Sequence, residues 1–375
     1  MTVEQENRLA VGGTVAVLAF AGFLILMWFV GPAAGSNAAR QNRPQAEFPP
    51  VSLSAAADVT TFEQATAAFS DRLRAKPGVV ERVNSTVLRV TGRSPSADVV
   101  ARGDELYFAG EFTEPCLDPQ YATWARDSAR GLAAAARRGG KQVLFVVVPS
   151  KSVAVPPTGV GVTALTACQQ WSQEVLADIA SEPGSPVRII DPADVQAVAE
   201  GTGYWTGDTH WTPRGGQALS YLLAEQVGGS AAGRFEVGAP YDHQGDLYRL
   251  LGIPRSEPTE AVGPPAAAMP TFEEVPNGTP WPMRSFTSPE PLPGAPELLL
   301  VYDSFVYATG LEAQIASLFP AGWMVQWDAM PDVTQAGPAG LVVLESTDRL
   351  AVARLASLNR GGPNQPFLDY LSGKQ

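Results

Sequence analysis

The sequence predicts an α/β fold in which helices flank a mostly parallel β-sheet, and three segments carry this prediction. The runs KQVLFVVV at 141–148 and LLLVY at 298–302 are almost continuously apolar, as is typical of strands buried on both faces of a parallel sheet. The shorter run at 187–190 leads directly into Asp191 and Pro192, a cap and a first-turn proline that predict a helix start. Apolar strands that alternate with helices favour a mostly parallel sheet.

Periodicity and capping predict the remaining elements. Apolar residues at helical spacing, or helix-favouring composition, predict helices at 61–76, 119–138 and 162–179. Thr212 and Pro213 again combine an N-cap with a first-turn proline, so a helix is expected from there to about residue 227. Short apolar runs predict further strands at 104–109, 322–326 and 340–344.

One segment, 254–296, interrupts this alternation. It holds twelve of the 33 prolines and shows little periodicity. A loop of this length inside a compact domain is usually functional or disordered. Because it immediately precedes the strand at 298–302, we treat it as a Pro-rich insertion beside a candidate site.

The amino-terminal part of the chain predicts a membrane anchor. Residues 10–30 form an uncharged apolar run long enough to cross a bilayer as a helix. A short tail at 1–9 precedes it, a flexible linker at 31–60 follows, and one folded domain fills 61–375. Small residues at 33–38 leave a cleaved signal peptide open as the alternative.

Composition excludes some classes of protein. The 375-residue chain is 45% hydrophobic, enough for a sizeable core, and its formal charge of −12 argues against binding to nucleic acid. The two cysteines, Cys116 and Cys168, form a disulfide in an exported domain or stay as buried free thiols. They are too few for a zinc site with the distant histidines, so neither a metal nor a cofactor is expected.

Acid–base chemistry is indicated near one of the two histidines. Asp208 lies two residues before His210, at the mouth of the predicted helix, where it can fix the imidazole tautomer. A lone histidine is more often structural, and for His243, which lacks such neighbours, surface exposure or packing is the expected role.

A candidate nucleophile follows the strand at 298–302. Ser304 lies just past its carboxyl end, the edge at which open α/β sheets bind ligands. Its own N–H or that of Phe305 can then face a developing oxyanion. The competing interpretation is that Asp303 and Ser304 only cap a helix. Lys151, after the strand at 141–148, is expected at the same edge, either orienting a substrate oxygen or simply solvated.

Together these stretches resemble the alginate O-acetyltransferase family of exported, circularly permuted SGNH-hydrolase-like acetyltransferases. The resemblance rests on 100–108, 148–151, Asp208-Thr209-His210-Trp211, Asp303-Ser304-Phe305 and 345–350, in the order of the family. It implies an SGNH-hydrolase-like catalytic domain with Ser304 as nucleophile, His210 as base and Asp208 as its orienting group. One departure is Tyr302, where the family commonly has glycine, so the turn or the oxyanion pocket is expected to differ.

The resemblance also implies partners and a location. We expect acetyl transfer to hydroxyls of an exported or cell-envelope polysaccharide, with a polytopic membrane O-acyltransferase as donor. The domain is then on the extracytoplasmic side of the cell membrane, anchored by 10–30. Trp205, Trp211 and Trp281 are candidate walls of a sugar groove or ordinary core residues. An acetyl esterase with the same triad and a non-catalytic polysaccharide-binding scaffold remain the alternatives.

Overall fold

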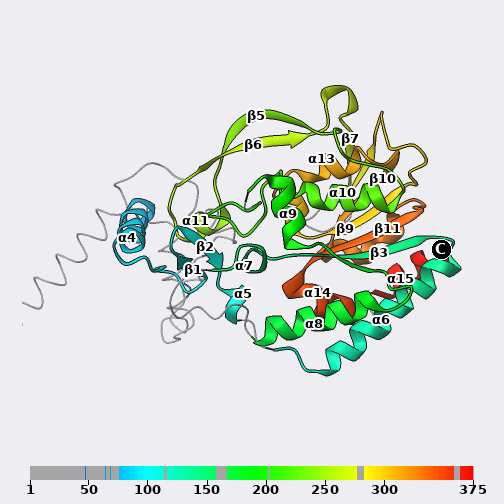
Figure 1. Ribbon diagram of the computed structural model, residues 1–375, viewed down its shortest axis with the longest axis horizontal. Helices are drawn as coiled ribbons and strands as arrows, with labels where there is room; N and C mark the ends of the chain where they lie inside the picture. The colour runs from blue at the N-terminus through cyan, green and yellow to red at the C-terminus, as the bar shows by residue number, and fades with distance from the viewer. Residues whose placement is uncertain are drawn as a thin grey trace, which may run out of the picture. The chain divides into compact units, whose positions relative to one another are not determined.

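The computed structural model describes residues 47, 64, 68, 76–113, 116–157, 167–201, 203–276, 283–358 and 364–374. Figure 1 shows the chain, which divides into two compact units, one of residues up to Ala101 with 246–255, the other of 102–245 with 256–375. Among the described residues, no helix is both long and apolar enough to span a membrane. The expected anchor at 10–30, the linker at 31–60 apart from residue 47, and most of the expected helix at 61–76 lie outside the described residues.

The first unit contains two described helices. These are α4 (Lys76–Thr91) and α11 (Asp246–Leu250). The Asn84 amide donates to the Leu251 carbonyl at 2.7 Å, which ties α4 to the end of α11. The chain passes into the second unit within strand β1 (Val99–Arg102).

A seven-stranded sheet forms the centre of the second unit, in the order β4-β3-β11-β9-β10-β8-β7. Its strands are β3 (Gln142–Val148), β4 (Val187–Ile189), β7 (Thr271–Val275), β8 (Met283–Thr287), β9 (Leu298–Tyr302), β10 (Ala321–Gln326) and β11 (Leu341–Thr347). The first five strands in spatial order pair in parallel, whereas β8 pairs antiparallel with both β10 and β7. The sheet is therefore mixed, and not parallel throughout. The last two strands in the spatial order, β8 and β7, form an antiparallel pair.

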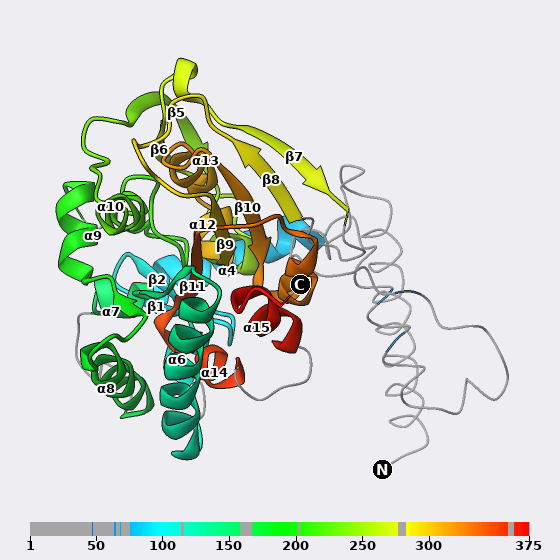
Figure 2. The same cartoon turned by 90° about the vertical axis from the view of Figure 1, so that its right-hand side faces the viewer.

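Helices cover both faces of this sheet (Figure 2). One apolar core includes residues of α6 (Gln120–Arg138), α8 (Ala167–Ser181), α14 (Asp348–Ser357), α15 (Gln365–Leu371) and the 3₁₀ helix η3 (Trp327–Gln335). The opposite core includes residues of α9 (Pro192–Ala199), α10 (Gln217–Gln226) and α13 (Leu311–Ala316). Alternate residues of the central strands serve the two cores, as expected for strands buried on both faces. Shorter elements complete the unit: β2 (Glu105–Phe108), α5 (Gly110–Thr113), α7 (Lys151–Ala154), η2 (Ala266–Ala268) and α12 (Ser304–Tyr307).

The Pro-rich segment 254–296 is not a structureless loop. It supplies β7 and β8 to the sheet, and β6 (Glu257–Gly263), which pairs antiparallel with β5 (Glu236–His243). We call the pair β5–β6 the ribbon. Most of its residues are exposed, so apolar periodicity, which depends on burial, gives little sign of it.

Helix α10 begins later than the sequence predicts. The Thr212 hydroxyl accepts a hydrogen bond from the Gly215 backbone N–H at 3.1 Å, so it caps a turn. The regular helix starts only at Gln217, after two glycines, which are poor helix formers. In contrast, Asp191 caps α9 as expected, accepting from the Ala193 N–H at 2.8 Å.

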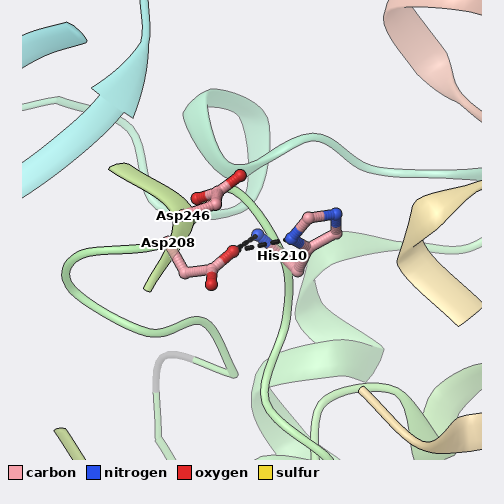
Figure 3. Close-up of side chains that lie close together, drawn as sticks. All are labelled: Asp208, His210 and Asp246. Atoms are coloured by element: carbon pink, nitrogen blue, oxygen red, sulfur yellow. Dashed lines mark hydrogen bonds and ion pairs between the residues drawn. The ribbon is translucent and has the colours of Figure 1, made fainter. Parts of the chain in front are cut away.

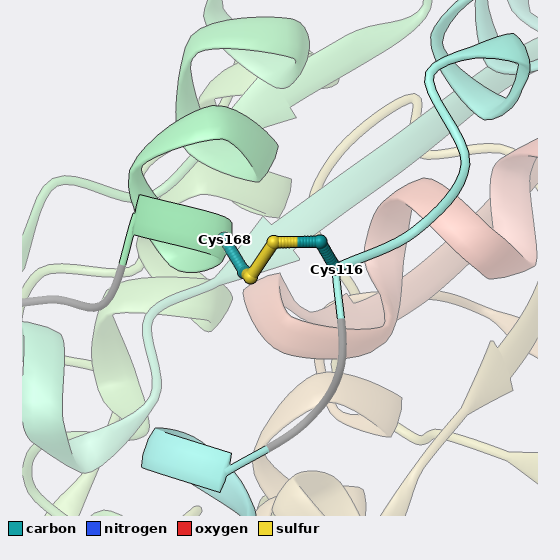
Figure 4. Close-up of a disulfide and its surroundings, with 2 residues drawn as sticks. All are labelled: Cys116 and Cys168. Carbon is teal, nitrogen blue, oxygen red and sulfur yellow. A yellow bond between two sulfur atoms is a disulfide. The ribbon is translucent and has the colours of Figure 1, made fainter.

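Both cysteines lie in the second unit and form a disulfide (Figure 4). The bond joins Cys116, just before α6, to Cys168 in the first turn of α8, with a Cα–Cα distance of 4.8 Å. Of the two alternatives that the sequence left open, the structure has the bonded one. Crosslinks of this kind are typical of oxidising compartments.

Candidate active site

Three side chains from two distant segments meet at the carboxyl edge of the sheet. Ser304, the first residue of α12, is exposed, and its Oγ lies 2.9 Å from His210 Nε2. On the other side of the imidazole, Nδ1 lies 2.6 Å from Asp208 Oδ1 (Figure 3). Asp246, drawn in the same figure, is part of the first unit. The parts that the sequence suggested therefore form one continuous Ser–His–Asp chain of hydrogen bonds.

The carboxylate fixes the tautomer of His210. An ionised Asp208 can only accept hydrogen bonds, so the proton between it and the ring is on Nδ1. Nε2 is then an acceptor, which is the state required to take the hydroxyl proton of Ser304. Burial would raise the pKa of Asp208, but hydrogen bonds from His210 and His243 hold that pKa well below its usual range. Asp208 thus stays ionised at neutral pH.

A second carboxylate shapes the turn that carries Ser304. Asp303 is the N-cap of α12, and its Oδ1 accepts the Phe305 backbone N–H at 2.9 Å. Its Oδ2 accepts from the Thr347 N–H at 3.0 Å and from the Arg354 guanidinium at 2.8 Å. Asp303 therefore both caps α12 and ties the end of β9 to β11 and α14.

Glu345 supports the same turn from the neighbouring strand. It is fully buried on β11, and its Oε2 accepts the Asp303 backbone N–H at 2.9 Å. Burial, with the nearby charge of Asp303, raises the pKa of Glu345 well above its usual range. A neutral carboxyl group is therefore expected there at neutral pH.

Two of the residues expected to touch substrate are occupied elsewhere. The Phe305 N–H is taken by Asp303, so it is not the oxyanion donor that the sequence suggested. Trp211 is fully buried, and its indole N–H donates to the Phe305 carbonyl at 2.9 Å. Trp211 thus braces α12 from the core instead of lining a groove.

Lys151 is structural rather than substrate-facing. Its side chain is fully buried, and Nζ donates to the carbonyls of Leu106, Trp205 and Thr206 at 2.6 to 2.8 Å. It also forms an ion pair with Glu105 at 2.8 Å. Burial lowers the pKa of Lys151, and the Glu105 charge opposes that shift. These contacts tie β2 to the loop that leads into Asp208.

Tyr302 does not crowd the turn that carries Ser304. Its ring is buried in the core on the side of α10 and α13, and its hydroxyl donates to Glu312 Oε1 at 2.5 Å. Glu312 also pairs with Arg284 on β8 at 2.9 Å. The bulky residue at this family glycine position is therefore accommodated by the core. Trp205 is likewise buried, and Trp281 lies outside the described residues.

The sequence did not predict the contact that His243 makes with Asp208. Its Nε2 lies 2.7 Å from Asp208 Oδ2, and its ring stacks on Trp205 with centroids 3.6 Å apart. Glu257, opposite it on the ribbon, accepts the backbone N–H groups of Thr206 and Gly207 at 2.8 and 2.6 Å. Nothing in the local sequence links position 243 to position 208, because the contact is made only by folding of the ribbon.

Comparison with protein families supports the resemblance. A family model described as the SGNH hydrolase-like domain of the acetyltransferase AlgX matches residues 99–279. The predicted resemblance to the alginate acetyltransferases is thereby confirmed, together with an SGNH-like α/β fold. Ser304 lies beyond the matched residues, so its assignment depends on the geometry. No curated protein sequence is significantly similar to this chain.

Solved structures show distant likeness. A DHHW family protein from Eubacterium siraeum is 13% identical with a TM-score of 0.48, covering 73% of this chain and 94% of that one. PatB1 from Bacillus cereus is 12% identical with a TM-score of 0.47, covering 68% and 96%. The O-acetyltransferase domain of Pseudomonas putida AlgJ is 19% identical with a TM-score of 0.46, covering 74% and 99%. At these values the likeness carries no functional conclusion.

Proposed function

Because the chain carries an AlgX-type, SGNH hydrolase-like acetyltransferase domain over residues 99–279, we propose that it transfers acetyl groups through Ser304 to hydroxyls of a polysaccharide. The observation that carries the proposal is the 2.9 Å contact between Ser304 Oγ and a His210 whose tautomer is fixed by Asp208. Ser304 is exposed, which suits an acceptor too large to enter a closed pocket.

The first step loads the serine. Ser304 Oγ attacks the carbonyl carbon of the acetyl donor while His210 Nε2 takes the hydroxyl proton. As the tetrahedral intermediate collapses, the bond to the donor breaks, and His210 returns the proton to the leaving group. Asp208 stabilises the imidazolium that forms in between, since it remains ionised beside Nδ1.

The second step transfers the acetyl group. His210, neutral again, takes a proton from a sugar hydroxyl, whose oxygen attacks the acetyl carbon. The Ser304–carbon bond breaks, and the proton passes to Ser304 Oγ. For the oxyanion of both steps, the remaining backbone candidate is the Ser304 N–H, because Asp303 takes that of Phe305. One such donor is typically worth about 100- to 1000-fold in turnover.

The wider setting of the reaction is part of the same proposal. Residues 10–30 would anchor the chain as a single membrane-spanning helix, with the acetyltransferase domain outside the cytoplasm. The disulfide between Cys116 and Cys168 supports an oxidising compartment. Since acetyl-CoA is a cytosolic donor, a polytopic membrane acyltransferase would pass the acetyl group across the bilayer.

The test uses purified full chain, an activated acetyl ester and an oligosaccharide acceptor. Mass spectrometry is expected to detect an acetylated Ser304 peptide and an acetylated oligosaccharide, both absent with Ser304→Ala. Acetate release without acetylated sugar would indicate an esterase with the same triad. Failure of a fluorophosphonate to label wild type would favour the non-catalytic scaffold, and labelling that persists in Ser304→Ala would remove Ser304 as the nucleophile.

A further inference from the structure

Asp208 is shared between two histidines. Its Oδ1 accepts from His210 Nδ1 and from the His210 backbone N–H, while its Oδ2 lies 2.7 Å from His243 Nε2. The Asp208 side chain is only 1% exposed, so protein groups rather than solvent must satisfy both oxygens. His243 thus adds a fourth side chain to the triad. In the described hydrogen bonds, it contacts Asp208 and neither Ser304 nor the imidazole of His210.

The orientation of His243 is fixed from two directions. Its ring stacks on Trp205, with planes 11° apart, and its side chain is only 12% exposed. Because the Asp208 carboxylate can only accept, the His243 nitrogen that faces it carries a proton. The stacked indole restrains the plane of the ring, in which this N–H faces Asp208.

The ribbon positions His243 next to Asp208. His243 and Glu257 are cross-strand partners on β5 and β6, and both reach the same loop. Glu257 accepts the backbone N–H groups of Thr206 and Gly207, immediately before Asp208. Gly245 passes so close to this loop that an added Cβ would lie 2.0 Å from the Gly207 carbonyl oxygen. The ribbon thus contacts the loop through a donor and an acceptor, and the chain just after β5 adds a close backbone approach.

We propose that His243 is a positioning residue of the acetyl-transfer site, acting through Asp208 to hold the carboxylate in the orientation that fixes His210. This inference rests on the proposed function, since it assigns His243 a part in the Ser304 reaction. Without the His243 N–H, the buried Asp208 Oδ2 loses the donor that lies 2.7 Å from it. The carboxylate is then held less firmly, and a rotation of it displaces its contact with His210.

The experiment compares two substitutions in the full chain. His243→Leu removes the donor, and His243→Gln retains an N–H donor near the position of Nε2. The readouts are kcat and KM for an activated acetyl ester, the rate of fluorophosphonate labelling of Ser304, and the thermal unfolding midpoint. We expect His243→Leu to lower kcat and the labelling rate about 100-fold, the effect of a misplacement near 1 Å. His243→Gln should stay within about threefold of wild type, and KM should barely change in either.

A double-mutant cycle separates positioning from simple loss of structure. In an Asp208→Ala background, His243→Leu should cost less than about threefold more, because the residue through which it acts is already gone. A further large loss in that background, equal loss in His243→Gln and His243→Leu, or no loss in either would overturn the inference. If wild type is labelled at Ser304, these outcomes leave the proposed function intact. If wild type is neither labelled nor active, the proposed function fails and the inference fails with it.

Discussion

The proposed nucleophile, Ser304, and its proposed base, His210, meet across 2.9 Å, yet two very different parts of the molecule hold them. Ser304 follows β9 in the middle of the sheet, and its turn is fixed by Asp303 and Glu345 between buried strands. His210 belongs to a loop outside the sheet, held by the mostly exposed ribbon and by Lys151. Ser304, although exposed, is thus held by groups of the buried sheet, whereas His210 is held mainly by side chains from outside the sheet.

This difference separates stability from rate. Substitutions around Ser304 disturb strands that the whole fold needs, so they should lower the free energy of unfolding together with activity. Substitutions around His210 disturb a loop whose contacts contribute less to the global fold, so activity should change more than stability. Local unfolding begins in weakly packed, exposed segments. At this site, the segment of that kind is the ribbon.

The largest effect on rate is expected on the base side, from Asp208→Asn. The asparagine amide can donate to His210 Nδ1, which moves the ring proton to Nε2 and leaves no acceptor for the Ser304 hydroxyl. We expect kcat to fall about 10⁴-fold, the size known for loss of this tautomer control. Steady-state acetyl transfer measures it, and the thermal midpoint should move little. Asp242→Asn, an exposed neighbour of His243 on β5, is the control and should behave as wild type.

On the nucleophile side, Asp303→Ala should reduce stability as well as activity. It removes the cap of α12 and leaves the Arg354 guanidinium without its ion pair. We expect the free energy of unfolding to fall by about 3 kcal/mol, measured by urea denaturation. Asp191→Ala removes a cap without a buried ion pair, so it should cost only about 1 kcal/mol. Equal losses in the two variants would mean that Arg354 contributes nothing.

The two halves of the site also differ in how far sequence alone predicts them. The β9 turn and the Asp208–His210 pair are encoded locally, in an apolar strand followed by a cap and in two residues of fixed spacing. The ribbon is not, because its exposed strands lack the alternation that burial imposes. The place of His243 depends on a contact between residues 35 apart in sequence. Lys151 is a related case. The sequence places it after the strand at 141–148, but it does not predict that the side chain is buried among backbone carbonyls.

A smaller effect on rate should come from pH. His210 must be neutral to accept the Ser304 proton, so activity should rise with pH through a midpoint of about 6 to 7.5 and fall about tenfold per unit below it. Asp208 does not titrate in this range, because its pKa is held well below its usual value. A flat profile between about pH 5 and 8 would contradict a histidine base.

Two variants isolate that titration. The chain has two histidines, so His243→Gln leaves His210 as the only one. Glu111, a buried residue of α5, needs its own control, because burial raises its pKa to about 7. An acid whose pKa is raised on folding loses stability as pH rises from its unfolded to its folded pKa, here from about 4.5 to about 7. Stability should therefore fall over the pH range in which activity rises. Glu111→Gln should abolish this loss of stability without moving the midpoint of the activity profile.

The smallest effect is expected at the centre of the nucleophile side, from Glu345→Gln. Burial raises the pKa of Glu345 well above its usual range, so we expect the native group to be neutral already, and glutamine retains the oxygen that accepts the Asp303 N–H. Stability should change by less than about 1 kcal/mol, whereas Glu345→Leu leaves that buried N–H unpaired and should cost about 1 to 3 kcal/mol. Urea denaturation of the two variants distinguishes them. If glutamine destabilised the protein as much as leucine, the turn would require a charged Glu345, and the nucleophile side would depend on electrostatics as strongly as the base side does.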